Sequence, residues 1–286
     1  MAEYRFLREN TEDSYGLKLL QDTLTEIVLY IDSFCKEHNI RYFLMGGSAL
    51  GAVRHGGFIP WDDDLDIFML REDYEKFVEC CKTDLDTGKY YFQQADSAEQ
   101  PHFFSKIRKN GTAYLEEGRK GENIHQGIYI DIMCLYYAPQ SRWKRKLQYY
   151  AAGLLKARAC TKTNYHTASR VKKLELTVAK VVVHGPIKKL LLHMVKKYKK
   201  EGSPLAAHLF GRAKFDCSFY PVEEFEKQRY VPFEKIQLPI PGNAEEYLTI
   251  RYGKDYMQMP DQATRAIYGT HSVMWDTQKD YKELIK

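Results

Sequence analysis

An acidic run that leads directly into an apolar segment is the feature that most restricts how this chain can fold. The run is Asp62-Asp63-Asp64-Leu65-Asp66, and the four residues from Ile67 to Leu70 are all apolar. On a strand, Asp64 and Asp66 would share one face with Cα atoms roughly 6.5 Å apart, while Leu65 and Ile67 would point into the core. Two adjacent carboxylates repel each other and are costly to desolvate, so the pattern predicts a metal site. A solvated acidic loop is the alternative interpretation.

A glycine-rich turn precedes this run. Residues 41–45 are typical of a buried strand that ends at Gly46-Gly47, and Ser48 is expected to cap a short helix that continues through Val53. Glycines allow backbone N–H groups to approach a ligand closely, and a helix N-terminus favours an anion. Gly46, Gly47 and Ser48 are therefore candidate phosphate-binding residues, although a Gly-Gly pair by itself marks only a tight turn.

Asp131 is the third candidate carboxylate. It lies in the segment from Ile128 to Cys134, where isoleucines alternate onto one face of a predicted strand and Asp131 falls on the other. An aspartate in so apolar a strand needs a partner. We interpret it as a third metal ligand or a general base. A buried aspartate that is satisfied by the backbone or by an arginine is the alternative.

Three cations are candidates to hold phosphate oxygens. Lys106 and Arg108 alternate on a predicted strand, and Arg54 follows the glycine-rich turn. Ordinary surface charge is an equally good explanation of all three. His55 and His271 could assist, but a lone histidine is more often structural, so neither is included among the predicted site residues.

The periodicity of apolar residues predicts an α/β (α+β) fold in which a mixed sheet is flanked by helices. The predicted domains are a catalytic core at 1–140, a basic helical region at 141–212 that faces the acceptor or a membrane, and a C-terminal segment at 213–286 that packs back on the core. Helices are expected at 15–38, 71–82 and 244–252, and a hairpin or edge strand at 231–240. Strands are expected at 65–70, 90–94, 103–108 and 127–134.

The basic helical region concentrates the positive charge of the chain. From Arg142 to Lys200 there are 17 Lys and Arg residues and a single acid, Glu175, although the whole chain has a net charge of only +5. Val181 to Val183 and Ile187 to Tyr198 interleave apolar residues with lysines. Such a helix can lie on an anionic membrane surface. It can equally pack its apolar face on the domain and leave its lysines in water.

The N-terminus has no apolar stretch typical of a secretory signal, and no segment approaches the ~20 apolar residues that span a bilayer. The six cysteines show no CxxC spacing, which favours reduced thiols. We expect a cytoplasmic protein with peripheral contact at the inner face of the plasma membrane.

Several segments together carry a family resemblance. The stretch Gly-Ala-Val-Arg-His-Gly-Gly-Phe-Ile-Pro-Trp-Asp-Asp-Asp-Leu-Asp at 51–66, followed by Arg-Glu-Asp-Tyr-Glu-Lys-Phe at 71–77, resembles the LicD family of phosphocholine transferases, which is related to the fukutin-type proteins. Gly-Ile-Tyr-Ile-Asp-Ile at 127–132 and Tyr-Gly-Lys-Asp-Tyr-Met at 252–257 are also similar to that family. One difference is that relatives often continue the Asp131 strand with Phe-Pro-Leu-Asp, where this chain has Met133-Cys134-Leu135-Tyr136.

The resemblance implies a nucleotidyltransferase-like fold and transfer of a substituted phosphate, such as phosphocholine, from a CDP-linked donor to a sugar hydroxyl with release of CMP. The acceptor would be a cell-surface glycan, such as teichoic acid, lipopolysaccharide or capsule, or its lipid-linked precursor. Asp64 and Asp66 would bind Mg²⁺, or Mn²⁺, and Asp131 would complete the metal site or accept the proton of the attacking hydroxyl.

Two other functions are consistent with parts of the sequence. The same fold can transfer a nucleotide itself to a small molecule or a protein. A non-enzymatic protein could bind nucleic acid through the basic segment, but this would leave the three carboxylates unexplained, so no nucleic-acid partner is expected.

Overall fold

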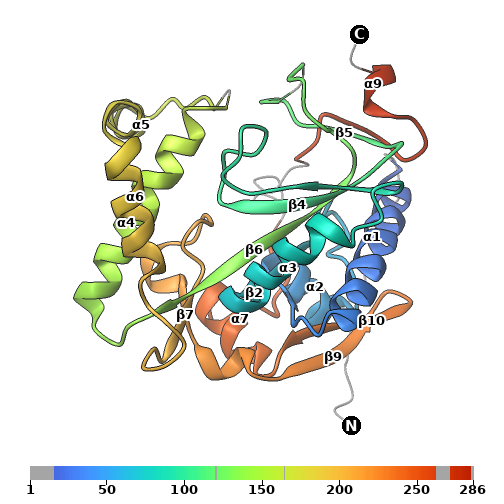
Figure 1. Cartoon of the computed structure of the whole chain (residues 1–286). Coiled ribbons are helices and arrows are strands. Elements are labelled where there is room, and N and C mark those ends of the chain that lie inside the picture. The colour runs from blue at the N-terminus through green and yellow to red at the C-terminus, as the bar shows by residue number, and fades with distance from the viewer. Residues whose placement is uncertain (1–15, 120, 164, 262–270, 285–286) are drawn as a thin grey trace.

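A computed structural model describes residues 16–119, 121–163, 165–261 and 271–284 of the chain (Figure 1). Its centre is a mixed sheet with strand order β1-β2-β6-β4-β3. Only the central pair β2–β6 is parallel, and the other neighbours along this path are antiparallel. The strands are β1 (Phe43–Leu44), β2 (Asp66–Leu70), β3 (Tyr90–Gln93), β4 (Phe104–Lys109) and β6 (Tyr129–Ala138).

The long strand β6 connects the central sheet to the short strands β7 (Leu205–Ala207) and β8 (Phe219–Pro221). Its first part pairs with β2 and β4, while its end, Tyr136–Ala138, pairs with β7, which in turn pairs with β8. Two antiparallel pairs complete the strands: β9 (Gln228–Phe233) with β10 (Ile236–Pro241), and β5 (Ala113–Leu115) with β11 (Met274–Asp276).

Helices cover both faces of the sheet. On one side α1 (Leu17–Glu37) packs against α3 (Arg71–Thr83), with the rings of Phe34 and Phe77 5.6 Å apart. On the other side the ring of Phe68 in β2 lies 5.9 Å from that of Tyr247 in α7 (Ala244–Tyr252), which also contacts α2 (Gly46–His55). Because alternate strand residues share a face, Asp66 lies on the Phe68 side.

A separate hydrophobic cluster joins the basic helices to the end of β6. The helices are α4 (Arg142–Cys160), α5 (Arg170–Val182) and α6 (Gly185–Lys196), and their buried residues include Leu155, Ala179 and Val195. Short elements complete the fold: η1 (Phe215–Cys217), η2 (Val222–Phe225) and α9 (Tyr281–Leu284). None of the helices in the described ranges is long and apolar enough to cross a membrane.

The predicted α/β fold with a mixed sheet flanked by helices is confirmed, and so are the hairpin at 231–240 and the helix at 244–252, which Asn243 caps by accepting the N–H of Glu246 at its Oδ1. One local expectation is wrong. The helix of the glycine-rich turn begins at Gly46, so Ser48 lies inside it rather than at its cap. The helical region at 141–200 is interrupted at Gly185-Pro186, where α5 has ended at Val182 and α6 begins, because a proline is readily accommodated in the first turn of a new helix.

Candidate functional site

One cation and two carboxylates form a row across three neighbouring strands. Asp66 on β2 is the register partner of Asp131 on β6, and Asp131 is the register partner of Lys106 on β4. The Lys106 ammonium Nζ lies 3.0 Å from Asp131 Oδ1. Three groups that are far apart in the sequence therefore meet on one face of the sheet.

Asp62 and Asp64, in the segment before β2, lie close to Asp66. Asp64 and Asp131 are only partly exposed, at 28% and 15% of their side chains. The pKa of Asp66 is raised well above its ordinary value. Burial is the largest cause, and repulsion from Asp64 and Asp131 follows. Burial likewise raises the pKa of Asp62, Asp64 and Asp131. A cluster of carboxylate oxygens that repel one another offers the hard ligands that Mg²⁺ prefers, so these residues fit the predicted metal.

The glycine-rich turn supports this cluster. The Ser48 hydroxyl oxygen accepts the N–H of Asp66 at 2.9 Å, so the start of α2 positions the start of β2. A Cβ on Gly47 would lie 2.9 Å from the Asp62 carboxylate, which explains the glycine at this close approach. The N–H of Gly46 donates to the Tyr247 hydroxyl at 2.9 Å. The structure thus places the turn next to the carboxylates, and its role toward a phosphate stays a prediction.

Asp63 forms a separate network that joins the acidic run to the C-terminal part of the chain. Its carboxylate accepts hydrogen bonds from the Tyr114 hydroxyl at 2.8 Å and from the backbone N–H of His271 at 2.8 Å. The His271 ring Nδ1 lies 3.0 Å from Asp63 and 3.5 Å from Asp64. The hydrogen bond to Asp63 outweighs burial and raises the pKa of His271 to about 9. Burial opposes ionisation of Asp63, yet the bonds from His271 and Tyr114 hold its pKa below the ordinary value.

The prediction from sequence omitted this network. In the sequence Asp63 is one member of an acidic run, Tyr114 carries no distinguishing signal, and His271 is a lone histidine of the kind that is more often structural. The sequence holds no local signal for their contact, because 208 residues separate Asp63 from His271. Their role is to fix the C-terminal segment beside Asp64.

Lys106 and Arg108 occupy buried positions on β4, with 3% and 1% of their surface exposed. The Lys106 ammonium also lies over the Tyr129 ring, 3.2 Å from its centroid. The Arg108 guanidinium donates to the Gln93 side chain at 2.9 Å and to the Gly127 carbonyl at 2.8 Å. Lys106 therefore belongs to the carboxylate row, whereas the bonds of Arg108 tie β4 to its neighbours.

Arg54 is buried at the end of α2, with 3% of its surface exposed. Its guanidinium donates to the carbonyls of Tyr256 and Gln258 at 3.0 and 3.1 Å. These bonds hold the segment after α7 against α2. The hydrogen bonds that Arg54 and Arg108 make in the structure hold neighbouring segments of the protein together. Phosphate binding by these two residues remains a prediction.

A cavity of about 410 Å³ opens beside Lys106, between the sheet and the basic helices. Its lining combines aromatic rings, including Phe104 and Phe210, with five cationic side chains and one carboxylate, Glu116. The cations are Lys106, Arg119, Lys156, Lys172 and Arg212. The pKa of Lys156 is lowered, mainly because the side chain is buried and secondly because Lys172 repels its charge. This excess of positive charge makes the cavity suited to an anionic or sugar-phosphate ligand.

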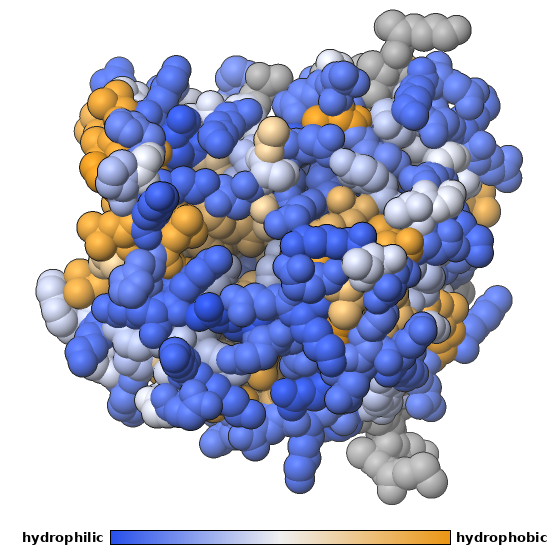
Figure 2. All heavy atoms as spheres, viewed as in Figure 1, coloured by the Kyte–Doolittle hydropathy of each residue, from blue (hydrophilic) through white to orange (hydrophobic). Residues whose placement is uncertain are grey.

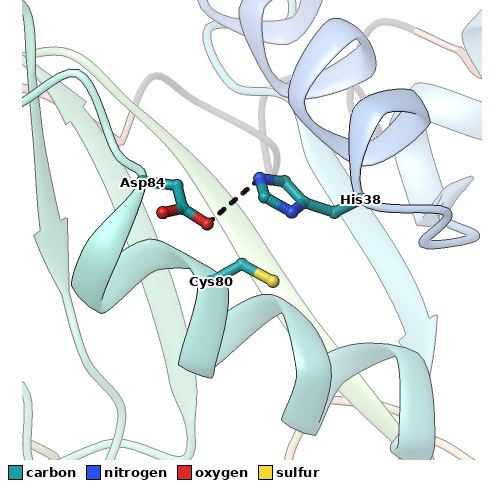
Figure 3. Close-up of side chains that lie close together, drawn as sticks. All are labelled: His38, Cys80 and Asp84. Carbon is teal, nitrogen blue, oxygen red and sulfur yellow. Dashed lines mark ion pairs between the residues drawn. The ribbon is translucent and has the colours of Figure 1, made fainter.

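A second group of potential ligands lies elsewhere, between the end of α1 and the end of α3. Figure 3 shows the side chains of His38, Cys80 and Asp84 close together. One ligand atom from each residue lies within 4.8 Å of the other two. The His38 Nε2 atom lies 3.5 Å from Asp84, whose side chain is 49% exposed. An ion pair between partly exposed groups explains this arrangement without a metal.

Comparison with known proteins identifies the domain that contains these residues. Residues 39–153 match the family described as LicD/FKTN/FKRP, nucleotidyltransferase domain, a range that includes Asp62 to Asp66, Lys106 and Asp131. The chain is 28% identical over 246 residues to the lipopolysaccharide cholinephosphotransferase LicD of Haemophilus influenzae, which covers 82% of this chain and 89% of that protein. A 50-residue stretch is 46% identical to the human ribitol 5-phosphate transferase FKRP, over 18% of this chain and 10% of FKRP. Residues 39–153 therefore form a nucleotidyltransferase domain of the LicD family.

Proposed function

We propose that this protein is a metal-dependent phosphotransferase that moves a substituted phosphate, of the phosphocholine type, from a CDP-linked donor to a sugar hydroxyl. The acceptor would be a cell-surface glycan or its lipid-linked precursor. The observation that carries the proposal is the row formed by Asp66, Asp131 and Lys106, with Asp64 beside it. Similarity to an enzyme named as a lipopolysaccharide cholinephosphotransferase supports the reaction class.

Each carboxylate and its neighbours have a specific role in this proposal. Asp64, Asp66 and Asp131 would hold Mg²⁺ or Mn²⁺, which when bound would neutralise charge on the donor phosphates as CMP leaves. The Ser48 hydroxyl holds the backbone of Asp66 and so fixes one of these carboxylates before substrate arrives. Lys106 engages Asp131 Oδ1, so Oδ2 is the atom assigned to the metal or to the proton of the attacking hydroxyl.

The cavity beside Lys106 is the proposed acceptor side. It lies beyond β4, next to the carboxylate row and away from the glycine-rich turn, which is proposed to face the donor phosphates. Aromatic rings such as Phe104 and Phe210 offer stacking surfaces for a sugar. Lys156 and Arg212 would meet anionic groups of the acceptor, and positioning of this kind supplies much of the rate in phosphoryl-type transfer.

The first test measures CMP release from CDP-choline, CDP-ethanolamine, CDP-glycerol and CDP-ribitol, with Mg²⁺ or with EDTA. Slow hydrolysis by water suffices as a signal when the acceptor is unknown. We expect metal-dependent release from one donor by the wild-type protein and none by Asp66→Ala. Asp22→Ala, which removes a carboxylate that is 61% exposed on α1, is the matched control and should retain the activity.

Two results would replace the proposal. Release of pyrophosphate from a nucleoside triphosphate, with no turnover or binding of any CDP-linked donor, would identify nucleotidyl transfer instead. CMP release that is unchanged by EDTA and by Asp66→Ala would show that the carboxylate row is not the active site.

A further inference from the structure

Helix α5 exposes most of its apolar residues to solvent. Val171, Leu174, Val178 and Val181 recur at intervals of three and four, so they lie along one side of the helix. Their surfaces are 79%, 66%, 45% and 67% exposed. Ala179 is the one buried residue in this helix and Leu176 packs partly buried beside it, so α5 meets the rest of the protein through the side that carries these two residues.

The exposed apolar residues continue through the turn into α6. Val182, Ile187 and Leu190 are 41%, 41% and 59% exposed. We call the seven residues the α5–α6 apolar face: Val171, Leu174, Val178, Val181, Val182, Ile187 and Leu190. In Figure 2 hydrophobic residues gather at the upper left, over the part of the molecule where Figure 1 labels α5 and α6. Exposed apolar residues that gather on one part of the surface mark an interaction site.

Positive charge borders this face. Arg170, Lys173, Lys180 and Lys189 are exposed on the same two helices. Within the segment from Arg142 to Lys200 there are 17 Lys and Arg residues, and the single acid, Glu175, is already paired with Lys172. An apolar strip beside lysines and arginines is the composition of helices that lie in the plane of a membrane interface.

The positive charge around the α5–α6 apolar face also indicates which binding partner it fits. A second copy of this chain would bring two strongly basic segments together, and like charges would repel across the interface. A nucleic acid would match the charge but would leave the apolar side chains without a partner. An anionic bilayer satisfies both features, because each Lys or Arg near its surface contributes about 1 kcal/mol and the apolar side chains enter the acyl boundary.

We propose that the α5–α6 apolar face docks this protein on a membrane that contains anionic lipids. The opposite side of α5 contributes Lys172 to the cavity beside Lys106, so docking would bring that cavity close to the bilayer. Presentation of a lipid-linked acceptor to the cavity rests on the proposed function, whereas the docking itself does not.

The test is co-flotation of the full-length protein with vesicles, in the absence of donor and acceptor. We expect binding to vesicles of phosphatidylcholine with 30% phosphatidylglycerol, and little binding to phosphatidylcholine alone. The triple variant Val171→Gln/Leu174→Gln/Val178→Gln should lower the affinity at least about tenfold, because three apolar contacts with the acyl boundary are lost. Glutamine favours a helix at least as well as valine, so α5 should be retained, which circular dichroism checks.

Two further variants separate the contributions. Lys173→Gln/Lys180→Gln should weaken binding chiefly at low salt, since salt screens exposed charges. Leu19→Gln, which removes a side chain on α1 that is 60% exposed, is the matched apolar control and should bind as the wild type does.

Three outcomes would overturn the proposal. They are absence of wild-type binding to the anionic vesicles, equal binding by the triple variant, and self-association of the wild-type protein that the triple variant abolishes. Binding to RNA but not to vesicles would equally refute a membrane role. CMP release from soluble donors is expected to be the same in the triple variant, so loss of docking and loss of the proposed reaction can be distinguished.

Discussion

Lys106 Nζ lies 3.0 Å from Asp131 Oδ1, and Asp131 is the register partner of Asp66 on the adjacent strand. The ammonium balances only part of the negative charge on this face, because Asp62, Asp64 and Asp66 lie there as well. The pKa values of all four aspartates are raised, with burial as the largest cause. The site therefore holds an excess of carboxylates that a bound cation would relieve.

Replacement of Lys106 tests how far the pair stabilises the fold. Lys106→Met would leave Asp131 buried without its cation, and we expect the free energy of unfolding to fall by roughly 3 kcal/mol. Lys106→Met/Asp131→Asn should recover much of this loss, because the uncompensated charge is gone, while activity stays abolished. Urea titrations of the wild type, both single variants and the double variant give the coupling energy. Additive losses would show that the two side chains do not interact.

Asp66→Asn should separate stability from activity. It removes one of several repelling carboxylates, so in the presence of EDTA at pH 8 the free energy of unfolding should rise by about 1 kcal/mol. Turnover should fall by a factor on the order of a thousand, as expected when a ligand of a catalytic metal is lost. Thermal unfolding with and without Mg²⁺ provides an independent measurement. The wild type should be stabilised by the metal, and a similar stabilisation of Asp66→Asn would place the metal elsewhere.

Much of this architecture can be predicted from the sequence because its signals are local. The period of apolar residues in 15–38 and 71–82 predicts helices close to the observed bounds of α1 and α3. Alternation around Asp131 predicts a strand with the aspartate opposite the isoleucines. Mutual repulsion of carboxylates at adjacent positions predicts a metal site as well, and the metal stays a prediction.

The rest depends on contacts between distant segments. Nothing near Asp63 indicates that His271 and Tyr114 meet it, and nothing near Arg54 indicates that carbonyls of the segment after α7 accept its hydrogen bonds. Short strands such as β5 and β11 exist only because they pair with each other. Likewise, an amphipathic period in α5 predicts a helix but does not tell whether its apolar side is buried or exposed.

Gly51→Ala should damage the turn that leads into the acidic run. A Cβ at this position would lie 2.4 Å from the backbone oxygen of Gly57, and a backbone atom cannot move aside as a flexible side chain can. We expect a loss of about 2 kcal/mol in the free energy of unfolding, as for other overpacked sites, together with reduced activity. Gly153→Ala in α4 is the matched control, since its Cβ would meet nothing within 4 Å. It should be neutral or stabilising by up to about 1 kcal/mol.

Lys156→Gln/Arg212→Gln addresses the cavity. Both side chains line it, and neither belongs to the carboxylate row. We expect the KM for an anionic glycan acceptor to rise about tenfold, while CMP release by hydrolysis of the donor changes less than about twofold, since only acceptor binding is weakened. Steady-state kinetics with varied acceptor and varied donor distinguish these effects. A rise in the KM for the donor instead would assign the cavity to the nucleotide.

Glu224 should make stability depend on pH. Its surface is 2% exposed, and burial, reinforced by repulsion from Glu246 and Glu223, raises its pKa to about 8. In the unfolded chain a glutamate has a pKa of about 4.3. Between these values the folded state keeps a proton that the unfolded state releases, so the free energy of unfolding falls as pH rises through this window and levels off above pH 8. Below pH 4 both states are protonated and the contribution of Glu224 is constant.

Glu224→Gln should remove this dependence, because the amide is neutral at every pH. Relative to the wild type we expect it to be more stable at pH 8.5, by on the order of 1 to 3 kcal/mol, and nearly equal in stability at pH 4.5. Urea unfolding at both pH values measures the difference. Glu37→Gln, at an exposed position near the end of α1, is the control and should follow the wild-type curve. A Glu224→Gln variant that is less stable at pH 8.5 would mean that the folded protein holds Glu224 as a carboxylate.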